Sequence, residues 1–215
     1  MPKKTTEKKN NDALKDALLL ATLPYVPELG WSRAALAAGA DVAGATEARA
    51  QTLFPAGDVD LIAHFIDWAD RRMLAGLAKA KLEKLKVRER IALAVRLRLE
   101  AITPYKSQEK QAMLVLARPW HAPMALKALY HTVDEMWRAA GDTATDFNFY
   151  TKRALLAGVF TSTLIFFLND ESKGHEKSWA YLAARIENVM QVGKLTGRLK
   201  EKVAGLKEKA QRRAA

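Results

Sequence analysis

Apolar side chains recur along this chain at intervals of three and four residues, the spacing of one face of an α-helix. After residue 57, for example, Leu61, Phe65 and Trp68 share one face, while His64 and Asp67 lie on another. Pro, Gly and capping residues separate such segments. The pattern predicts helices over 11–23, 33–38, 46–53, from 58 onward, and over 87–102, 106–117, 122–140, 146–168, 175–192 and 194–212.

The order of these elements indicates the fold class, which we expect to be all-α. Gly39 is expected to stop the second short helix, and Asp58 is expected to cap the long one. Three short helices, Phe54-Pro55 closing the third, and a long helix after it resemble the TetR-regulator architecture. The resemblance implies a bundle of about nine to ten helices with a helix-turn-helix-like unit at its start. The domains expected are a disordered 1–10, a helix-turn-helix-like 11–57, a helical domain over 58–193 and a basic amphipathic helix over 194–215.

Charge is unevenly distributed along the chain. The formal net charge is +11, and there is no cysteine, which excludes disulfides and thiolate metal sites. Residues 194–215 hold eight Lys and Arg against two Glu, and residues 79–100 hold eight against three Glu. Concentrated positive charge favours polyanions, either nucleic acid or an anionic membrane surface.

The motifs of a self-sufficient enzyme are missing, so we expect no catalysis, no metal and no cofactor. No Glu is followed by His at the spacing of a helical di-iron site, and neither HExxH nor GxSxG occurs. Asp60, His64 and Asp67 share one helix face, but a solvated polar face is the favoured interpretation over a metal site with so few ligands.

The segment 146–153 is the best candidate for recognition of a partner. It places aromatic and cationic side chains within one or two helical turns, so that Phe149 faces Lys152 and Arg153. Aromatic and Arg side chains together are typical of binding hot spots. The predicted partner-binding residues are Asp146, Phe149, Tyr150, Lys152 and Arg153. The alternative is that the aromatic residues belong to the core and the charges solvate a turn.

The continuation of that helix to Leu168 is apolar nearly all round, which is typical of a core helix, a ligand tunnel or a dimer interface. Small residues such as Gly158 would leave space for a ligand, although simple core packing explains the pattern equally. From periodicity we predict that the following residues line a lipid pocket: Leu155, Val159, Phe160, Leu164 and Phe167, with Met136 and Trp137 opposite.

The last segment has the pattern of a membrane-surface helix. Its apolar stripe is narrow and is surrounded by Lys and Arg, which suits anionic lipid, while a solvated tail is an equal alternative. The predicted membrane residues are Leu195, Leu199, Val203, Leu206, Lys200 and Lys202.

The order of several blocks resembles the Coq-nine family of ubiquinone biosynthesis, in its alphaproteobacterial form. The blocks are Trp31–Leu36, Leu53–Pro55, His64–Met73, Lys86–Ile91, Gly141–Arg153 and Arg185–Met190. The resemblance implies a TetR-like fold reused for binding isoprenoid lipids. It also implies docking, through the 146–153 residues, on the di-iron hydroxylase that acts on demethoxyubiquinone. The family usually has Trp where this chain has Phe149, and Phe lacks the indole donor.

From this resemblance we expect an accessory protein that presents quinone intermediates at the membrane. The partners expected are an isoprenoid quinone or phospholipid, the demethoxyubiquinone hydroxylase, an anionic membrane surface and a second copy of the chain, but no nucleic acid. The hydrophilic Met1–Asn10 is no secretory signal and a poor mitochondrial presequence, so we expect a cytoplasmic protein, peripheral on the inner face of a bacterial inner membrane. The alternative is a TetR-type DNA-binding regulator, although the segment 46–53 offers only Glu47 and Arg49 as charged residues.

Overall fold

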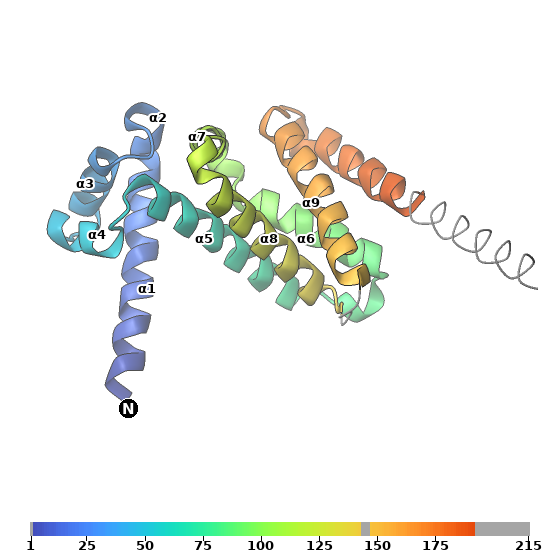
Figure 1. The fold of residues 1–215 in the computed structure, drawn as a ribbon, viewed down its shortest axis with the longest axis horizontal. Coiled ribbons are helices and arrows are strands. Elements are labelled where there is room, and N and C mark those ends of the chain that lie inside the picture. The colour runs from blue at the N-terminus through green and yellow to red at the C-terminus, as the bar shows by residue number, and fades with distance from the viewer. Residues whose placement is uncertain (1, 143–146, 192–215) are drawn as a thin grey trace, which may run out of the picture. The chain divides into compact units, whose positions relative to one another are not determined.

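The computed structural model describes the backbone of residues 2–142 and 147–191, and that part of the chain is all-α (Figure 1). It divides into two compact units, Met1–Arg153 and Ala154–Ala215. The elements are α1 (Pro2–Thr22), η1 (Leu23–Tyr25), α2 (Val26–Leu29), α3 (Arg33–Val42), α4 (Glu47–Leu53), α5 (Asp58–Lys79), η2 (Leu82–Lys84), α6 (Val87–Ala101), η3 (Thr103–Tyr105), α7 (Lys106–Leu116), η4 (Pro119–His121), α8 (Ala122–Ala139), α9 (Phe147–Leu168), η5 (Lys173–His175) and a helix over 176–191.

The first unit begins with α1, α3 and α4 packed together (Figure 1). Side-chain caps define where the two short helices start, since Ser32 Oγ accepts from the Ala35 amide and Thr46 Oγ1 from the Arg49 amide. α1 begins at Pro2, whereas the sequence pattern predicts a helix only from residue 11. The long helix begins at Asp58, so that Gly57, with a φ of 64°, occupies the cap position predicted for Asp58.

The prediction that Gly39 ends the second short helix is wrong. α3 continues to Val42, and Gly39 is buried within it. A Cβ at Gly39 would lie 2.8 Å from the Thr22 backbone and closer still to Thr22 Oγ1. Glycine is therefore present because α1 crosses at that point with no room for a side chain, and the close approach outweighs its poor helix propensity.

The larger part of the first unit consists of α5, α6, α7 and α8, with the core at their shared face. Phe65 lies at its centre, fully buried, with ring centroids 5.4 Å from Trp31, 6.1 Å from Trp68 and 6.2 Å from Tyr105. Trp31 also donates through Nε1 to the Gln108 carbonyl, 3.0 Å away. This aromatic cluster ties the short-helix region to α5 and to α7.

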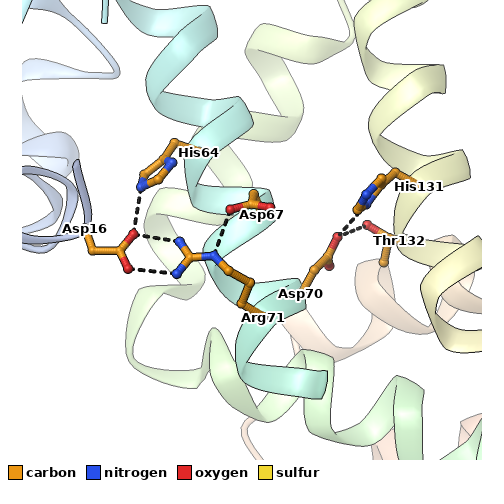
Figure 2. A network of polar contacts seen from close by, with 7 residues as sticks. All are labelled: Asp16, His64, Asp67, Asp70, Arg71, His131 and Thr132. Carbon is orange, nitrogen blue, oxygen red and sulfur yellow. Dashed lines mark hydrogen bonds and ion pairs between the residues drawn. The ribbon is translucent and has the colours of Figure 1, made fainter. Parts of the chain in front are cut away.

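A buried polar cluster lies beside this core. Asp70 Oδ1 accepts from Arg98 Nε at 2.6 Å, and its Oδ2 accepts from Thr132 Oγ1 at 2.7 Å. Figure 2 shows the second contact together with His131, whose Nδ1 is 3.7 Å from Asp70 Oδ2. The Asp70 and Arg98 side chains are each 3 % exposed, so three helices meet at one desolvated ion pair.

A second network joins α1 to α5 and is more exposed (Figure 2). Arg71 donates to both oxygens of Asp16, at 2.6 and 2.8 Å, and to Asp67 at 2.8 Å. His64 Nε2 lies 2.8 Å from Asp16 Oδ1. These pairs fix the rotation of α1 against the long helix.

In the second unit, α9 and the helix over 176–191 are joined by a turn that Asp170 organises. Its Oδ2 accepts from the Ser178 amide at 2.8 Å and from Ser178 Oγ at 2.6 Å, while Oδ1 accepts from the Ser172 amide at 2.9 Å. The Phe166 and Tyr181 rings stack with centroids 4.6 Å apart. The two helices are therefore pinned to one another at this end.

Candidate functional site

The candidate site starts where α8 ends. Gly141 has a φ of 88°, and its amide donates to the Arg138 carbonyl at 3.0 Å. The next amide, that of Asp142, donates to the Trp137 carbonyl at 3.0 Å. A glycine in the left-handed region ends the helix, and this turn directs Asp142 back toward its last residues.

Two carboxylates then hold the cations of the first turns of α9. Arg153 Nε donates to Asp134 Oδ1 at 2.6 Å, and its Nη1 donates to Asp142 Oδ2 at 3.3 Å. Lys152 Nζ donates to Asp142 Oδ1 at 2.7 Å. The Arg153 side chain is 3 % exposed and the Lys152 side chain 39 %. Arg153 is thus a positioning residue, and Lys152 remains within reach of solvent.

The aromatic side chains lie against these cations. The Arg153 guanidinium carbon is 3.3 Å from the Phe149 ring centroid, and its Nη1 also donates to the Phe149 carbonyl. Phe149 and Tyr150 meet edge to face with centroids 5.1 Å apart. Tyr150 is 66 % exposed. The arrangement places an exposed tyrosine beside a phenylalanine held by an arginine, and Tyr and Arg are enriched in binding hot spots.

Trp137 completes this surface from the side of α8. Its Nε1 donates to the Lys152 carbonyl at 3.2 Å, and Lys152 Nζ lies 5.5 Å from its ring centroid. We call the surface formed by Trp137, Phe149, Tyr150 and Lys152 the aromatic patch. Carboxylates, backbone carbonyls and ring faces all fix the two cations at this surface.

The structure places four of the five predicted partner-binding residues in this one cluster, and Asp146 lies outside the described residues. The pairing of Phe149 with Arg153 is the one that helical spacing predicts. Asp134 and Asp142 were not predicted from the sequence. The only hint in the sequence is that both carboxylates come shortly before Lys152 and Arg153 along the chain. Helical spacing predicts contacts within one helix, and these contacts cross the turn between α8 and α9.

The predicted lipid-binding residues fall into both units. Met136 and Trp137 belong to the first, and the rest belong to α9 in the second. Val159, Phe160, Leu164 and Phe167 are all buried, whereas Leu155 is 36 % exposed and the buried residue of that turn is Leu156. The buried face of α9 therefore passes through four of the five predicted positions on that helix.

Each unit also has a hollow that was not predicted from the sequence. The one in the second unit measures about 690 Å³ and is lined by Ser162, Ile165, Phe166, Asn169, Asp170, Glu171, Ser172, Lys177 and Tyr181. The one in the first unit measures about 270 Å³ and is lined by Ala63, Ile66, Asp67, Asp70, Met124, Lys127, Ala128 and His131. None of the predicted lipid-binding residues lines either hollow, because helical periodicity identifies a buried face rather than an opening.

Within the described residues, one helix has the length and apolar composition of a membrane span. Phe149–Leu168 is long and apolar enough to cross a membrane, and 44 % of its most apolar stretch is buried. The core helix of a soluble protein passes the same test, so length and composition alone carry little weight. The six predicted membrane residues between Leu195 and Leu206 lie outside the described residues.

The three residues considered for a metal have other partners. Asp60 accepts from the Ala56 amide, Asp67 from Arg71, and His64 lies against Asp16. Burial lowers the pKa of His64, and the neighbouring Asp16 carboxylate only partly offsets that effect. Within 2–142 and 147–191, no group of three His, Asp or Glu side chains is placed to hold a metal ion.

The charged residues of α4, the helix in the place of a DNA-recognition helix, also contact neighbours in the chain. Glu47 Oε1 accepts from Gln51 at 2.9 Å, and Arg49 Nη2 donates to Asn11 at 2.5 Å. Phosphate contacts need free cations and donors on such a helix. Arg49 is thus the one cation of α4, and its partner here is the neutral Asn11 amide.

Comparison with known proteins places these features in a family. A family model described as COQ9 matches residues 122–193, and one described as "Ubiquinone biosynthesis protein COQ9, N-terminal domain" matches residues 11–41. The first includes α8, the turn after it and α9, and so it contains the aromatic patch.

Curated relatives match most of the chain. The "Ubiquinone biosynthesis protein COQ9, mitochondrial" of Drosophila melanogaster is 36 % identical over 84 % of this chain and 56 % of its own length. The protein of the same name from Homo sapiens is 33 % identical over 86 % of this chain and 60 % of its own length. The chain thus spans less than two thirds of these relatives.

A solved structure supports the TetR-like fold expected from the helix order. The TetR transcriptional regulator from Nitrosomonas europaea ATCC 19718 superposes with a TM-score of 0.68, covering 81 % of this chain and 97 % of the regulator. The two are 18 % identical, so this likeness concerns the fold alone. The helix order resembles that of a TetR regulator, and the family models and curated relatives show that the chain is similar to COQ9 proteins.

Proposed function

We propose that this protein is a non-catalytic accessory protein of ubiquinone biosynthesis. It binds isoprenoid quinone intermediates and presents them to the demethoxyubiquinone hydroxylase at the cytoplasmic face of a bacterial inner membrane, as a homodimer. The names of the curated relatives support the pathway. The observation that carries the proposal is the aromatic patch, in which an exposed Tyr150 packs edge to face on Phe149, and Arg153 stacks on the Phe149 ring.

The patch suits a protein partner better than it suits catalysis. Lys152 and Arg153 share Asp142, and Arg153 shares Asp134 with Arg138, so each cation has a carboxylate partner within the chain. Electrostatic catalysis relies on donors directed at the reacting atoms, whereas Arg153 directs its donors at oxygens of the chain itself. An exposed aromatic ring over fixed neighbours loses little side-chain entropy when a partner covers it.

Lipid binding is supported by the character of α9. Val159, Phe160, Leu164 and Phe167 form a continuous apolar face that the chain itself covers in this structure. An isoprenoid would reach this face when α9 shifts, and each CH₂ buried there would contribute about 0.8 kcal/mol. Gly158 lies on the exposed side of α9, and a Cβ added there would meet no atom within 4 Å, so the small residue leaves room on the outer face of the helix. A polyprenyl tail is too apolar to cross water unaided, and a carrier with such a surface would shelter it.

Native mass spectrometry of the purified full chain tests the lipid part of the proposal. We expect an isoprenoid quinone or a phospholipid at about one per chain, identified after extraction. A protein free of lipid that instead retains DNA, with a gel shift surviving physiological salt, would contradict the proposal and favour a regulator.

Substitution of the exposed ring tests the partner. Tyr150→Ala is expected to weaken binding of the hydroxylase about tenfold or more, as hot-spot truncations do. The matched control is Leu29→Ala, which removes an exposed apolar side chain of the same unit outside the aromatic patch. Phe149→Trp, which restores the indole donor usual in the family, is expected to bind at least as tightly. Equal binding by the wild type and Tyr150→Ala would refute docking at the aromatic patch.

A further inference from the structure

Four exposed large apolar side chains of the first unit lie in one stretch of chain, from α7 through η4 into α8. Leu114 is 72 % exposed, Trp120 is 71 % and Leu126 is 67 %, and Tyr130 follows Leu126 by one helical turn at 46 %. Scattered single exposures are ordinary, but four large apolar residues within seventeen positions indicate a surface that binds something.

Trp120 stands at the tip of this surface on a rigid turn. η4 begins at Pro119, and the His121 amide donates to the Arg118 carbonyl at 2.9 Å. The His121 ring lies within 2.9 Å of the Val115 carbonyl through Nδ1 and meets the Trp120 ring edge to face. The indole is therefore held outward by its own backbone and is not the end of a loose loop.

The exposed charges along this stretch of the chain are of one sign. Lys110, Arg118 and Lys127 are exposed, and the one acidic residue between 106 and 130, Glu109, is buried at 6 % exposure. An anionic lipid surface attracts such cations, and tryptophan prefers the boundary between headgroups and acyl chains. Nucleic acid would instead require aromatic residues stacked along a cationic groove.

From these observations we infer that the α7–η4–α8 tip (Leu114, Trp120, Leu126 and Tyr130, with Lys110, Arg118 and Lys127 around them) docks on the surface of an anionic phospholipid bilayer. The contact lies in the folded body and is separate from the membrane contact expected of residues 194–215. It deepens the proposed function and rests only on the part that places the protein at a membrane, not on quinone binding.

Trp fluorescence quenching tests the tip directly, because residues 192–215 contain no Trp. The full chain is mixed with vesicles of phosphatidylcholine containing about a third phosphatidylglycerol, with brominated acyl chains as quencher. We expect quenching that is largely lost in Trp120→Phe, since Trp31 and Trp68 are buried and the other two tryptophans are partly covered. Quenching that is unchanged in Trp120→Phe, or absent in the wild type while the protein is bound, would overturn the inference.

Partitioning into the same vesicles supplies the second measurement. Trp120→Ser with Leu126→Ser is expected to lower the partition coefficient about tenfold, since both lose interfacial apolar area. The matched control, Val42→Ser with Val87→Ser, removes two other exposed apolar residues of the unit and is expected to leave it unchanged. Circular dichroism checks that each variant is folded.

The outcomes separate the inference from the proposed function. Vesicle binding without a contribution from Trp120 would leave a carrier anchored elsewhere and would refute docking by the tip. Quenching of Trp120 in a protein that carries no isoprenoid would support the tip and contradict the carrier. If Trp120→Ser with Leu126→Ser dissociates an oligomer in sedimentation while vesicle binding is kept, the occupant is a second copy and the inference is wrong.

Discussion

Arg98 and Arg153 are equally buried, each 3 % exposed, yet they are compensated in different ways. Arg153 meets two carboxylates, one backbone carbonyl and an aromatic face. Arg98 meets Asp70 through Nε, and its Nη1 has no hydrogen-bond partner among the described residues. The cost of a buried guanidinium depends on how many of its donors are satisfied, so the number of partners distinguishes these two sites where burial does not.

The difference matches the place of each arginine in the fold. The Arg153 cluster lies at the start of α9 and holds Phe149, on which the exposed Tyr150 packs. Because Arg153 has several partners, loss of one of them leaves this surface in place. The Arg98 cluster connects α5, α6 and α8 in the interior, where a single ion pair holds their relative position. Glu109, also buried, adds a carboxyl whose pKa is raised by burial. We therefore expect the Arg98 cluster to be more sensitive to substitution.

The largest effect is expected for Asp70→Ala, which leaves Arg98 with no carboxylate hydrogen-bonded to it. Loss of one partner from a buried ion pair destabilises by about 3–5 kcal/mol, and urea denaturation measures it. The double substitution Asp70→Leu with Arg98→Met is expected to recover most of that loss, because it removes both charges. If the double variant is as unstable as the single one, the uncompensated charge is not the cause.

A smaller loss, about 2 kcal/mol, is expected for Asp142→Asn, because Arg153 keeps Asp134 when one charged hydrogen bond is removed. Lys152 loses its carboxylate in the same variant, so we expect hydroxylase binding to weaken more than stability alone explains. Comparison of denaturation with a binding isotherm separates the two effects. A loss as large as that of Asp70→Ala would break the comparison between the two arginines.

Glu109→Gln is expected to stabilise the protein, whereas the substitutions above destabilise it. The folded-state pKa of Glu109 lies above its ordinary value of 4.5, so the native state binds more protons than the unfolded state above that pH, and stability falls as pH rises. Gln removes this penalty, and we expect a gain on the order of 1 kcal/mol at neutral pH. The gain should vanish at acidic pH, where the carboxyl is neutral in both states. A gain independent of pH would contradict this cause.

The sequence was sufficient for elements whose signal is local. Periodicity predicted the ranges of α6 to α9 within about two residues, and Ser32 and Thr46 act as caps where cap chemistry predicts them. Gly39 shows the limit, since a residue that ends helices in general is held inside one by the approach of α1, a contact that no local pattern contains.

Sites were predictable only as far as one helix determines them. The stacking of Arg153 on Phe149 follows from helical spacing, whereas Asp134 and Asp142 reach the same guanidinium across a turn. The Asp70–Arg98 pair spans 28 positions and had no signal at all. The tip at Trp120 was missed for a related reason, because exposure of an apolar residue depends on which neighbours cover it.

The smallest effect on stability is expected for the network around Arg71. Arg71 is exposed, whereas Arg98 and Arg153 are buried, so it tests whether partner number still matters when solvent reaches the guanidinium. Arg71 is 45 % exposed and Asp16 29 %, so solvent screens the pair, and Asp16→Asn should cost less than about 1 kcal/mol.

The same network contains His64, whose pKa is lowered chiefly by burial, despite the neighbouring Asp16. Since the unfolded state takes up a proton near pH 6.5 before the native state does, His64 makes stability fall as pH drops below that value. His64→Gln, which keeps a donor toward Asp16, should flatten this slope in denaturation curves measured on either side of that pH. An unchanged slope would mean that burial does not lower the pKa of His64 in the native state.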